Sequence, residues 1–137
     1  MVTLSLMGKD DCDAVINILV DNGIEDDLTD GIIYVLKDRS NIMGVGKISN
    51  MGNYGVLKYI IVDKKFRGFN YGESILRGLL FKCRSLEISK VYYRNHDDYL
   101  LKVGFISNIE FSSNNYSLVL DINDFFNNSC CGDIDEI

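Results

Sequence analysis

One stretch of the chain, from Leu57 to Ser85, constrains the fold more than any other. Its first part contains the apolar run Ile60–Val62, which is typical of a strand covered on both faces. Its last part predicts a helix over 70–85, because apolar residues recur at a period near 3.6 and share one face. These residues are Tyr71, Ile75, Leu76, Leu79, Leu80 and Cys83. The stretch therefore predicts a strand, a short loop and an amphipathic helix in succession.

The loop between strand and helix has the composition of an anion site. It carries three cations in a chain of net charge −6: Lys64, Lys65 and Arg67. The first turn of a helix has backbone amides without internal partners, and the helix dipole adds partial positive charge. Gly68 and Gly72 let backbone approach a ligand closely, and Asn70 tolerates a positive φ. The pattern predicts a phosphate or pyrophosphate site, with an ordinary tight turn as the alternative.

Two other phosphate-binding loops do not fit this sequence. The loop lacks the Gly-Lys-Ser/Thr ending of a nucleotide P-loop and the third glycine of the dinucleotide fingerprint. A dinucleotide-binding fold also places its loop after the first strand, whereas several strand candidates precede this one.

Residues 62–72 resemble the acyl-CoA signature of the GCN5-related N-acetyltransferase (GNAT) superfamily. That signature is Val, four residues, and then Arg/Gln-x-x-Gly-x-Gly/Ala at the start of a helix. Val62, Arg67 and Gly72 match it, and Asn70 replaces the middle glycine. Residues 99–105, Tyr-Leu-Leu-Lys-Val-Gly-Phe, resemble the family's Leu-Tyr-Glu-Lys-Leu-Gly-Phe. The order of predicted elements is similar to that of the family across nearly the whole chain.

The resemblance implies a binding site for acetyl-CoA or CoA, as co-substrate, between two parallel strands that splay apart. Ile60, Ile61 and Val62 would pair with the pantetheine arm, and Asn95 could hydrogen-bond its amide. The pyrophosphate would be held by Arg67, Gly68, Phe69, Asn70, Tyr71 and Gly72. The acidic region around 25–30 would border the acceptor pocket.

The family's chemistry is direct attack of an amine on the thioester, without an acyl-enzyme. The resemblance therefore predicts an N-acetyltransferase acting on a small amine or a protein amino group. The alternative is a catalytically silent acyl-CoA-binding sensor or regulatory module. A third possibility keeps only the fold, with Asn70 having closed the phosphate site.

Catalytic residues are not identified by the sequence. Family members often carry a glutamate on the strand that corresponds to 54–62, where Lys58 is the one charged residue here. His96 is interpreted as a turn residue, with a catalytic base as the alternative. The family's general-acid tyrosine, four residues before Gly-Phe, corresponds to Leu100. Tyr99 is adjacent, but neighbours on a helix point about 100° apart.

The predicted fold class is α/β with a mixed sheet and helices on both faces. An antiparallel meander comes first, and a splayed parallel pair lies at the centre, joined by the helix as a right-handed crossover. The expected strands are 2–6, 32–36, 42–48, 54–62, 90–94, 106–111 and 116–121. The other expected helices are 10–22 and 97–103. Glycines inside strands indicate bulges or close backbone approach, with plain distortion of the sheet as the alternative: Gly44, Gly46 and Gly55.

Length and composition predict one domain over 1–121 and a short tail over 122–137, with one helical turn at 124–127. Acidity argues against a nucleic-acid binder, and the absence of a long apolar run argues against a membrane protein. We expect a cytoplasmic monomer or homodimer without a metal. Cys12 and Cys83 are expected in the core, and Cys130 and Cys131 as a free pair, with a redox or thiophilic-ligand role as the alternative.

Overall fold

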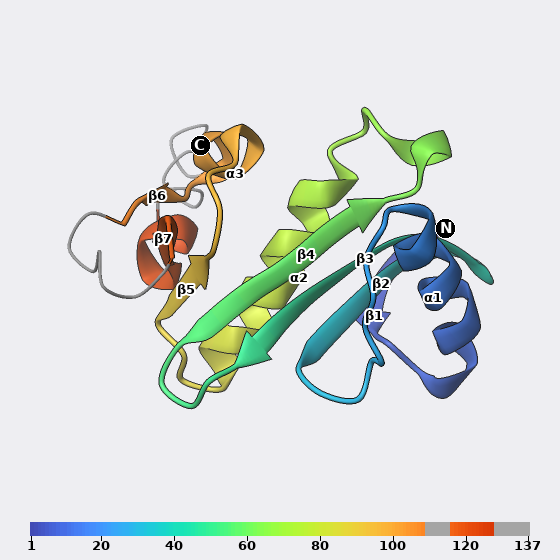
Figure 1. Cartoon of the computed structure of the whole chain (residues 1–137), viewed down its shortest axis with the longest axis horizontal. Coiled ribbons are helices and arrows are strands. Elements are labelled where there is room, and N and C mark those ends of the chain that lie inside the picture. The colour runs from blue at the N-terminus through green and yellow to red at the C-terminus, as the bar shows by residue number, and fades with distance from the viewer. Residues whose placement is uncertain (109–115, 128–137) are drawn as a thin grey trace. The chain divides into compact units, whose positions relative to one another are not determined.

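The computed structural model describes residues 1–108 and 116–127, which form a mixed seven-stranded sheet (Figure 1). The strand order is β1-β2-β3-β4-β5-β7-β6. The strands are β1 (Val2–Leu6), β2 (Ile32–Asp38), β3 (Asn41–Asn50), β4 (Gly55–Val62), β5 (Lys90–Tyr93), β6 (Ile106–Ser107) and β7 (Leu118–Asp121). The labelled helices are α1 (Cys12–Asp21), α2 (Tyr71–Ser85) and α3 (Asp98–Val103). The predicted α/β class and mixed sheet are confirmed.

The chain divides into two compact units. One contains Met1–Ser49 and Lys58–Lys82, and the other contains Asn50–Leu57 with the part of the chain from Cys83 onward. The first unit holds the loop that the sequence predicts as an anion site, and the second holds Asn95, His96 and Tyr99.

The first unit contains the predicted antiparallel meander. β1 pairs with β2 from Val2↔Asp38 to Leu6↔Tyr34, and β2 pairs with β3 from Ile32↔Ile48 to Asp38↔Asn41. Both β2 and β3 extend beyond their predicted ends, because the pairing continues to the two-residue turn that joins them. Arg39 lies in that turn with a φ of 61°.

Helix α1 covers one face of this meander. Its buried Val15 and Leu19 pack in a cluster with residues of β2, β3 and β4. The strand residues of the cluster are Ile33, Val35, Ile42, Val45 and Tyr59. The chain enters α1 through a 3₁₀ turn at Lys9–Asp11, and Gly23 follows its C-cap with a φ of 74°. The helix predicted over 10–22 is thus confirmed, with a 3₁₀ start.

Helix α2 covers the opposite face, and Figure 1 shows it behind β3 and β4. Two glycines of β3 allow this approach. A Cβ on Gly44 would lie 2.9 Å from Ile75 Cδ1, and a Cβ on Gly46 would lie 2.6 Å from Ile75 Cγ2. Real Cβ atoms do not come this close, so the prediction of close backbone approach is confirmed at these two positions. Successive residues of a strand face opposite sides of the sheet, and Val45, between the two glycines, packs in the α1 cluster. Helices α1 and α2 therefore cover opposite faces.

The second unit contains the parallel pair. β4 pairs with β5 in parallel at Gly55↔Val91 and Val56↔Tyr92, as the predicted crossover through α2 requires. β5 pairs antiparallel with β7, and β7 with β6. The pairing of β6 with β7 thus agrees with the predicted hairpin. Residues 109–115 of that hairpin lie outside the described residues.

Residues 122–127 are helical, which includes the turn predicted at 124–127. Ile122, Phe125 and Phe126 are buried, and the Arg84 guanidinium lies 4.3 Å from the centre of the Phe126 ring. The domain boundary predicted after Asp121 stays a prediction. Cys130 and Cys131 lie outside the described residues. In the described ranges, no helix combines the length and the apolar character that a membrane crossing needs.

Candidate functional site

The predicted anion loop follows β4 directly. After Val62 the chain makes a 3₁₀ turn at Lys64–Phe66 and then reaches α2 at Tyr71. Two residues of the loop have left-handed backbone: Gly68 with a φ of 94° and Asn70 with a φ of 62°. Asparagine is among the few non-glycine residues that adopt this conformation readily. Asn70 thus keeps the backbone shape that the family's middle glycine would also allow.

The start of α2 directs backbone donors out of the helix. The Ser74 amide donates to the Asn70 carbonyl at 3.3 Å, which is the first turn of the helix. The amides of Tyr71, Gly72 and Glu73 precede this bond, and helix geometry gives such amides no carbonyl partner within the helix. Partial positive charge accumulates at this end through the helix dipole. The arrangement can bind an anion.

The three cations of the loop are exposed at their side chains, but they differ in what they contact. Arg67 Nε donates to the Val62 carbonyl at 2.8 Å, and Arg67 Nη2 donates to Asn22 Oδ1 at 3.3 Å. A cavity of ≈ 260 Å³ lies beside this contact, between the end of α1 and the loop. It is lined by Ile18, Asp21, Asn22, Asp63 and Lys64.

The other predicted CoA-binding residues lie as follows. Ile60, Ile61 and Val62 are half-buried at the end of β4, and Ile61 also packs against the α1 cluster. Phe69 is 64% exposed, and its ring centre lies 5.6 Å from that of Tyr71. Asn95 is exposed directly after β5 in the second unit. A CoA-binding role for each of these residues stays a prediction.

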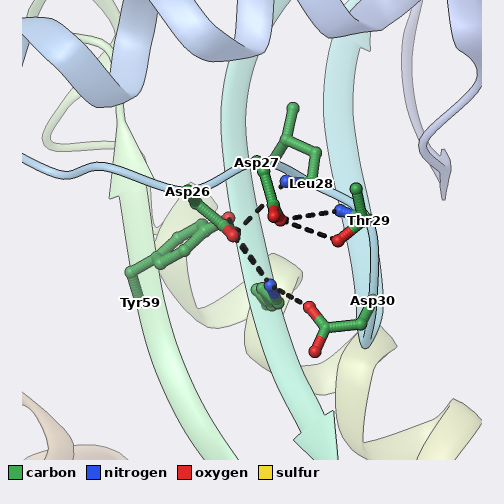
Figure 2. A network of polar contacts seen from close by, with 7 residues as sticks. Asp26, Asp27, Leu28, Thr29, Asp30 and Tyr59 are labelled. Atoms are coloured by element: carbon green, nitrogen blue, oxygen red, sulfur yellow. Dashed lines mark hydrogen bonds and ion pairs between the residues drawn. The ribbon is translucent and has the colours of Figure 1, made fainter.

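A second group of polar residues, not identified from the sequence, lies in the first unit (Figure 2). Lys47 Nζ, on β3, donates to both oxygens of Asp26 at 3.0 and 2.9 Å and to Asp30 Oδ1 at 2.9 Å. The Tyr59 hydroxyl donates to Asp26 Oδ2 at 2.7 Å. Figure 2 shows the carboxylates of Asp26 and Asp30 directed toward the same ammonium group, that of Lys47, and the Tyr59 side chain extending from β4 to Asp26. The Lys47 side chain is only 5% exposed, so its charge is compensated inside the protein.

The pKa values of this group follow from burial and hydrogen bonding. Burial alone would raise the pKa of Asp26, but hydrogen bonds from Lys47, Tyr59 and the Leu28 amide outweigh it and lower that pKa. Burial alone would lower the pKa of Lys47, but Asp26 and Asp30 raise it. Burial, together with the Asp26 carboxylate, raises the pKa of Tyr59. These shifts keep Lys47 as an ammonium, Asp26 as a carboxylate and Tyr59 as a neutral phenol near neutral pH.

The same loop brings three carboxylates together. Oxygens of Asp26, Asp27 and Asp30 lie within 4.8 Å of one another, a spacing that would suit a hard cation. Asp27 also accepts hydrogen bonds from the amide and hydroxyl of Thr29, which lower its pKa. Because the Lys47 ammonium already lies against Asp26 and Asp30, the chain itself supplies the cation for two of the three groups.

Shallow cavities flank this loop on two sides. One of ≈ 350 Å³ is lined by α1 and the loop residues that follow it: Ile16, Leu19, Val20, Ile24, Glu25, Asp26 and Asp27. Its wall is apolar and its rim is acidic. Another of ≈ 260 Å³ lies by β1 and is lined by Leu6, Met7, Leu28, Thr29, Asp30, Gly31 and Ile33.

The other residues considered for catalysis lie outside this polar network. His96 is exposed and bonds Asp98 at 2.8 Å in the turn before α3, as a turn residue would. Lys58 is exposed. Leu100 is buried, at 4% exposed, whereas Tyr99 is 43% exposed. Cys83 is fully buried, as expected of a core residue, and burial raises the pKa of its thiol to about 11. Cys12, also expected in the core, is only half-buried.

The comparison with known proteins rests on structure, since no protein-family model and no curated protein matches the sequence. N-acetylglutamate synthase of Neisseria gonorrhoeae, complexed with coenzyme A and N-acetyl-glutamate, matches 89% of this chain with a TM-score of 0.74 and 16% identity. This chain spans 35% of that synthase. Ard1 of Thermoplasma volcanium matches with a TM-score of 0.70 and 17% identity, over 88% of this chain and 97% of its own.

A GNAT family acetyltransferase of Elizabethkingia anophelis, with acetyl-CoA bound, matches with a TM-score of 0.63 and 18% identity, over 88% of this chain and 97% of its own. These matches define the chain as an α/β protein with a mixed sheet and helices. The fold is that of the GNAT acetyltransferases, as the sequence predicts.

Proposed function

We propose that the chain is an acetyl-CoA-dependent N-acetyltransferase that transfers the acetyl group by direct attack of an amine. The observation that carries the proposal is the loop after β4, where Gly68 and Asn70 have left-handed backbone. It leads into α2, whose first amides have no carbonyl partner within the helix. In the proposal this backbone binds the pyrophosphate of CoA, and the proposal is supported by the shared fold, since similar structures are complexed with coenzyme A or acetyl-CoA. Lys64 and Lys65 add the charge that attracts the anion.

In this proposal the pantetheine arm pairs with the backbone at Ile60, Ile61 and Val62. The pyrophosphate binds the backbone of residues 67–72. Catalysis then comes mainly from holding the amine and the thioester carbonyl together, since effective molarities of about 10⁵–10⁸ M are reachable by placement.

The acceptor amine is proposed to approach by the cavity between α1 and the acidic loop. From Asp10 to Leu36 the sequence has eight carboxylates and no lysine or arginine. Asp11 pairs with Lys37, and Asp26 and Asp30 pair with Lys47, which leaves Glu25 and Asp27 at the rim of the cavity. A rim of this charge favours a cationic amine over an anionic acceptor.

Asp26 does not fit the role of general base. Its two oxygens accept hydrogen bonds from Lys47 and Tyr59, and its pKa is lowered. A base that strips a proton from an ammonium works best with a pKa near the working pH. We therefore propose that the network positions the loop. The acceptor then reacts in its unprotonated amine form, without a general base.

The second candidate function is a silent acyl-CoA-binding module, which is favoured because no general base is identified among the described residues. Two measurements separate the candidates. Binding of CoA and acetyl-CoA is measured by the rise in melting temperature, since a ligand at a hundred times its Kd adds about 2.7 kcal/mol to the free energy of unfolding. Turnover is measured as CoA thiol released from acetyl-CoA with a panel of primary amines. Binding with turnover supports the enzyme, and binding alone supports the module.

Gly72→Val provides the test of the loop. A branched side chain in the first turn of α2 would occupy the space proposed for the pyrophosphate and abolish CoA binding, while circular dichroism stays that of a folded protein. Glu73→Val places the same group one residue further and serves as the control, with binding retained. If neither wild type nor variants respond to millimolar CoA, both candidate functions fail.

A further inference from the structure

We propose that Arg67 is a positioning residue for the CoA loop, and that its guanidinium holds the loop backbone and does not bind phosphate. The part of this inference that concerns CoA binding rests on the proposed function. Two of the three guanidinium nitrogens are already engaged within the protein: Nε by the Val62 carbonyl at 2.8 Å and Nη2 by Asn22 Oδ1 at 3.3 Å. The side chain thus points back along the loop to the elements on which it is built.

Asn22 is a fixed partner because it caps α1. Its amide donates to the Leu19 carbonyl at 3.0 Å, and its Nδ2 donates to the Ile18 carbonyl at 2.8 Å. The Nδ2 bond sets which side of the amide group carries the oxygen. Asn22 Oδ1 is therefore the atom that is presented to Arg67.

Val62 is a fixed partner because it ends β4. The next amide along the chain, that of Asp63, donates to the Met43 carbonyl of β3 at 2.8 Å. The backbone on the far side of the Val62 carbonyl is thereby held by the sheet. Arg67 joins this point to the end of α1, which lies 45 residues earlier in the sequence.

The loop needs such support because of its backbone. Gly68 follows Arg67 immediately with a φ of 94°, and Asn70 has a φ of 62°. Left-handed backbone is unstrained at a glycine, but at a non-glycine residue such as Asn70 it persists when the surroundings determine it. Because Arg67 holds the chain just before Gly68 and Asn70, the loop has one orientation there. The amides at the start of α2 therefore keep a common direction. A loop that is ordered before binding loses less entropy on binding.

Lys65 offers a matched control within the same loop. Its side chain is exposed, and in the described part of the chain its ammonium takes part in no hydrogen bond or ion pair. Lys65→Gln and Arg67→Gln each remove one positive charge, but only the second removes the contacts to Val62 and Asn22. If Arg67 acted through charge alone, the two variants would lose the same affinity for CoA.

The experiment measures the Kd of CoA by calorimetry at low and high salt. Arg67→Gln should weaken binding by about tenfold or more, since it removes hydrogen bonds from a charged donor. Lys65→Gln should weaken it by less than about threefold, as exposed charges do. Asn22→Ala should weaken it by about threefold in the wild-type background and leave the Kd unchanged in Arg67→Gln, because coupled residues are not additive.

Salt distinguishes positioning from direct phosphate binding. If Arg67 bound phosphate, Arg67→Gln would reduce the salt dependence of the Kd more than Lys65→Gln does, since screening acts on that contact. We expect the two variants to keep equal salt dependence. Equal losses of affinity in the two variants, or a salt dependence that falls only in Arg67→Gln, would overturn the proposal.

A readout on the free protein keeps the inference independent of the proposed function. NMR order parameters of the amides at 64–70 should fall in Arg67→Gln from about 0.85 towards 0.6, and stay unchanged in Lys65→Gln. If wild type binds no CoA and this fall is observed, the proposed function fails and the positioning role stands. If the order parameters do not change in Arg67→Gln, the positioning role fails.

Discussion

The Tyr59 hydroxyl donates a 2.7 Å hydrogen bond to the carboxylate of Asp26, and this joins β4 to the loop that leads into β2. The same carboxylate accepts two hydrogen bonds from Lys47, so β3 holds the loop as well. The loop is thus fixed by side chains of two strands. We infer that this network gives the acidic rim beside α1 a defined position.

Replacement of Lys47 by methionine should destabilise the protein strongly. The change leaves Asp26, whose side chain is 13% exposed, without its cation. Removing one partner of a buried ion pair costs about 3–5 kcal/mol, because the other charge stays desolvated. Urea unfolding followed by circular dichroism measures this free energy. Lys58→Met, at an exposed position on β4, should change it by less than about 0.5 kcal/mol. Equal effects of the two changes would contradict the buried pair.

The contribution of Asp26 to stability should depend on pH with a definite sign. Its pKa is lowered in the folded protein from an ordinary value of 3.8, so the unfolded chain takes up the proton first. The stabilisation is fully present above the unfolded pKa and is lost as the pH falls through the folded pKa. We expect the difference in unfolding free energy between wild type and Asp26→Asn to be constant from about pH 5 to 7 and to shrink below about pH 4. A difference that stays the same down to pH 3 would show that the pKa of Asp26 is not lowered.

Local patterns predicted the fold and the loop because both depend on residues that are close in sequence. The period of α2 and the glycines of residues 67–72 lie within one stretch of chain. The backbone of Asn70 could be predicted in this way, because its short polar side chain tolerates a positive φ. The structure gives it a φ of 62°.

The polar network could not be predicted in the same way, because it depends on contacts between distant residues. Lys47 and Asp26 are separated by 21 residues, and Arg67 and Asn22 by 45. A lysine on a strand is usually solvated, and only pairing explains its burial. The one signal in the sequence was a lone charge in the apolar strand around Lys47, following an acidic segment that has no cation of its own.

Substitutions at Asn70 should separate backbone shape from side-chain chemistry. Asn70→Gly keeps a left-handed conformation without strain and restores the family's glycine. We expect its Kd for CoA to lie within about threefold of wild type, a difference of well under 1.4 kcal/mol. Asn70→Val forces a β-branched residue into positive φ and should weaken binding by more than about tenfold, since such strain costs about 1–3 kcal/mol. Calorimetry measures both values. Weaker binding by the glycine variant would show that the Asn70 side chain itself contacts the ligand.

The last prediction concerns the proton that the departing CoA thiolate would take up. The family's general-acid position corresponds to Leu100, which is 4% exposed, and Asp97 caps α3 by accepting a 3.0 Å hydrogen bond from the Leu100 amide. The helix is therefore in the register that directs Leu100 into the core. Tyr99 is 43% exposed, and neighbours on a helix point about 100° apart, so we expect that Tyr99 does not replace the family's tyrosine.

A thiol with a pKa of about 8.5 is a tolerable leaving group without a general acid. We expect Tyr99→Phe to lower kcat by less than about tenfold, below the usual contribution of general acid catalysis. Turnover at saturating acetyl-CoA and the Kd of CoA are both measured, with Tyr34→Phe on β2 as the control for the loss of a tyrosine hydroxyl elsewhere. A fall in kcat of about a hundredfold with an unchanged Kd would lie within the range of general acid catalysis and would identify Tyr99 as the proton donor.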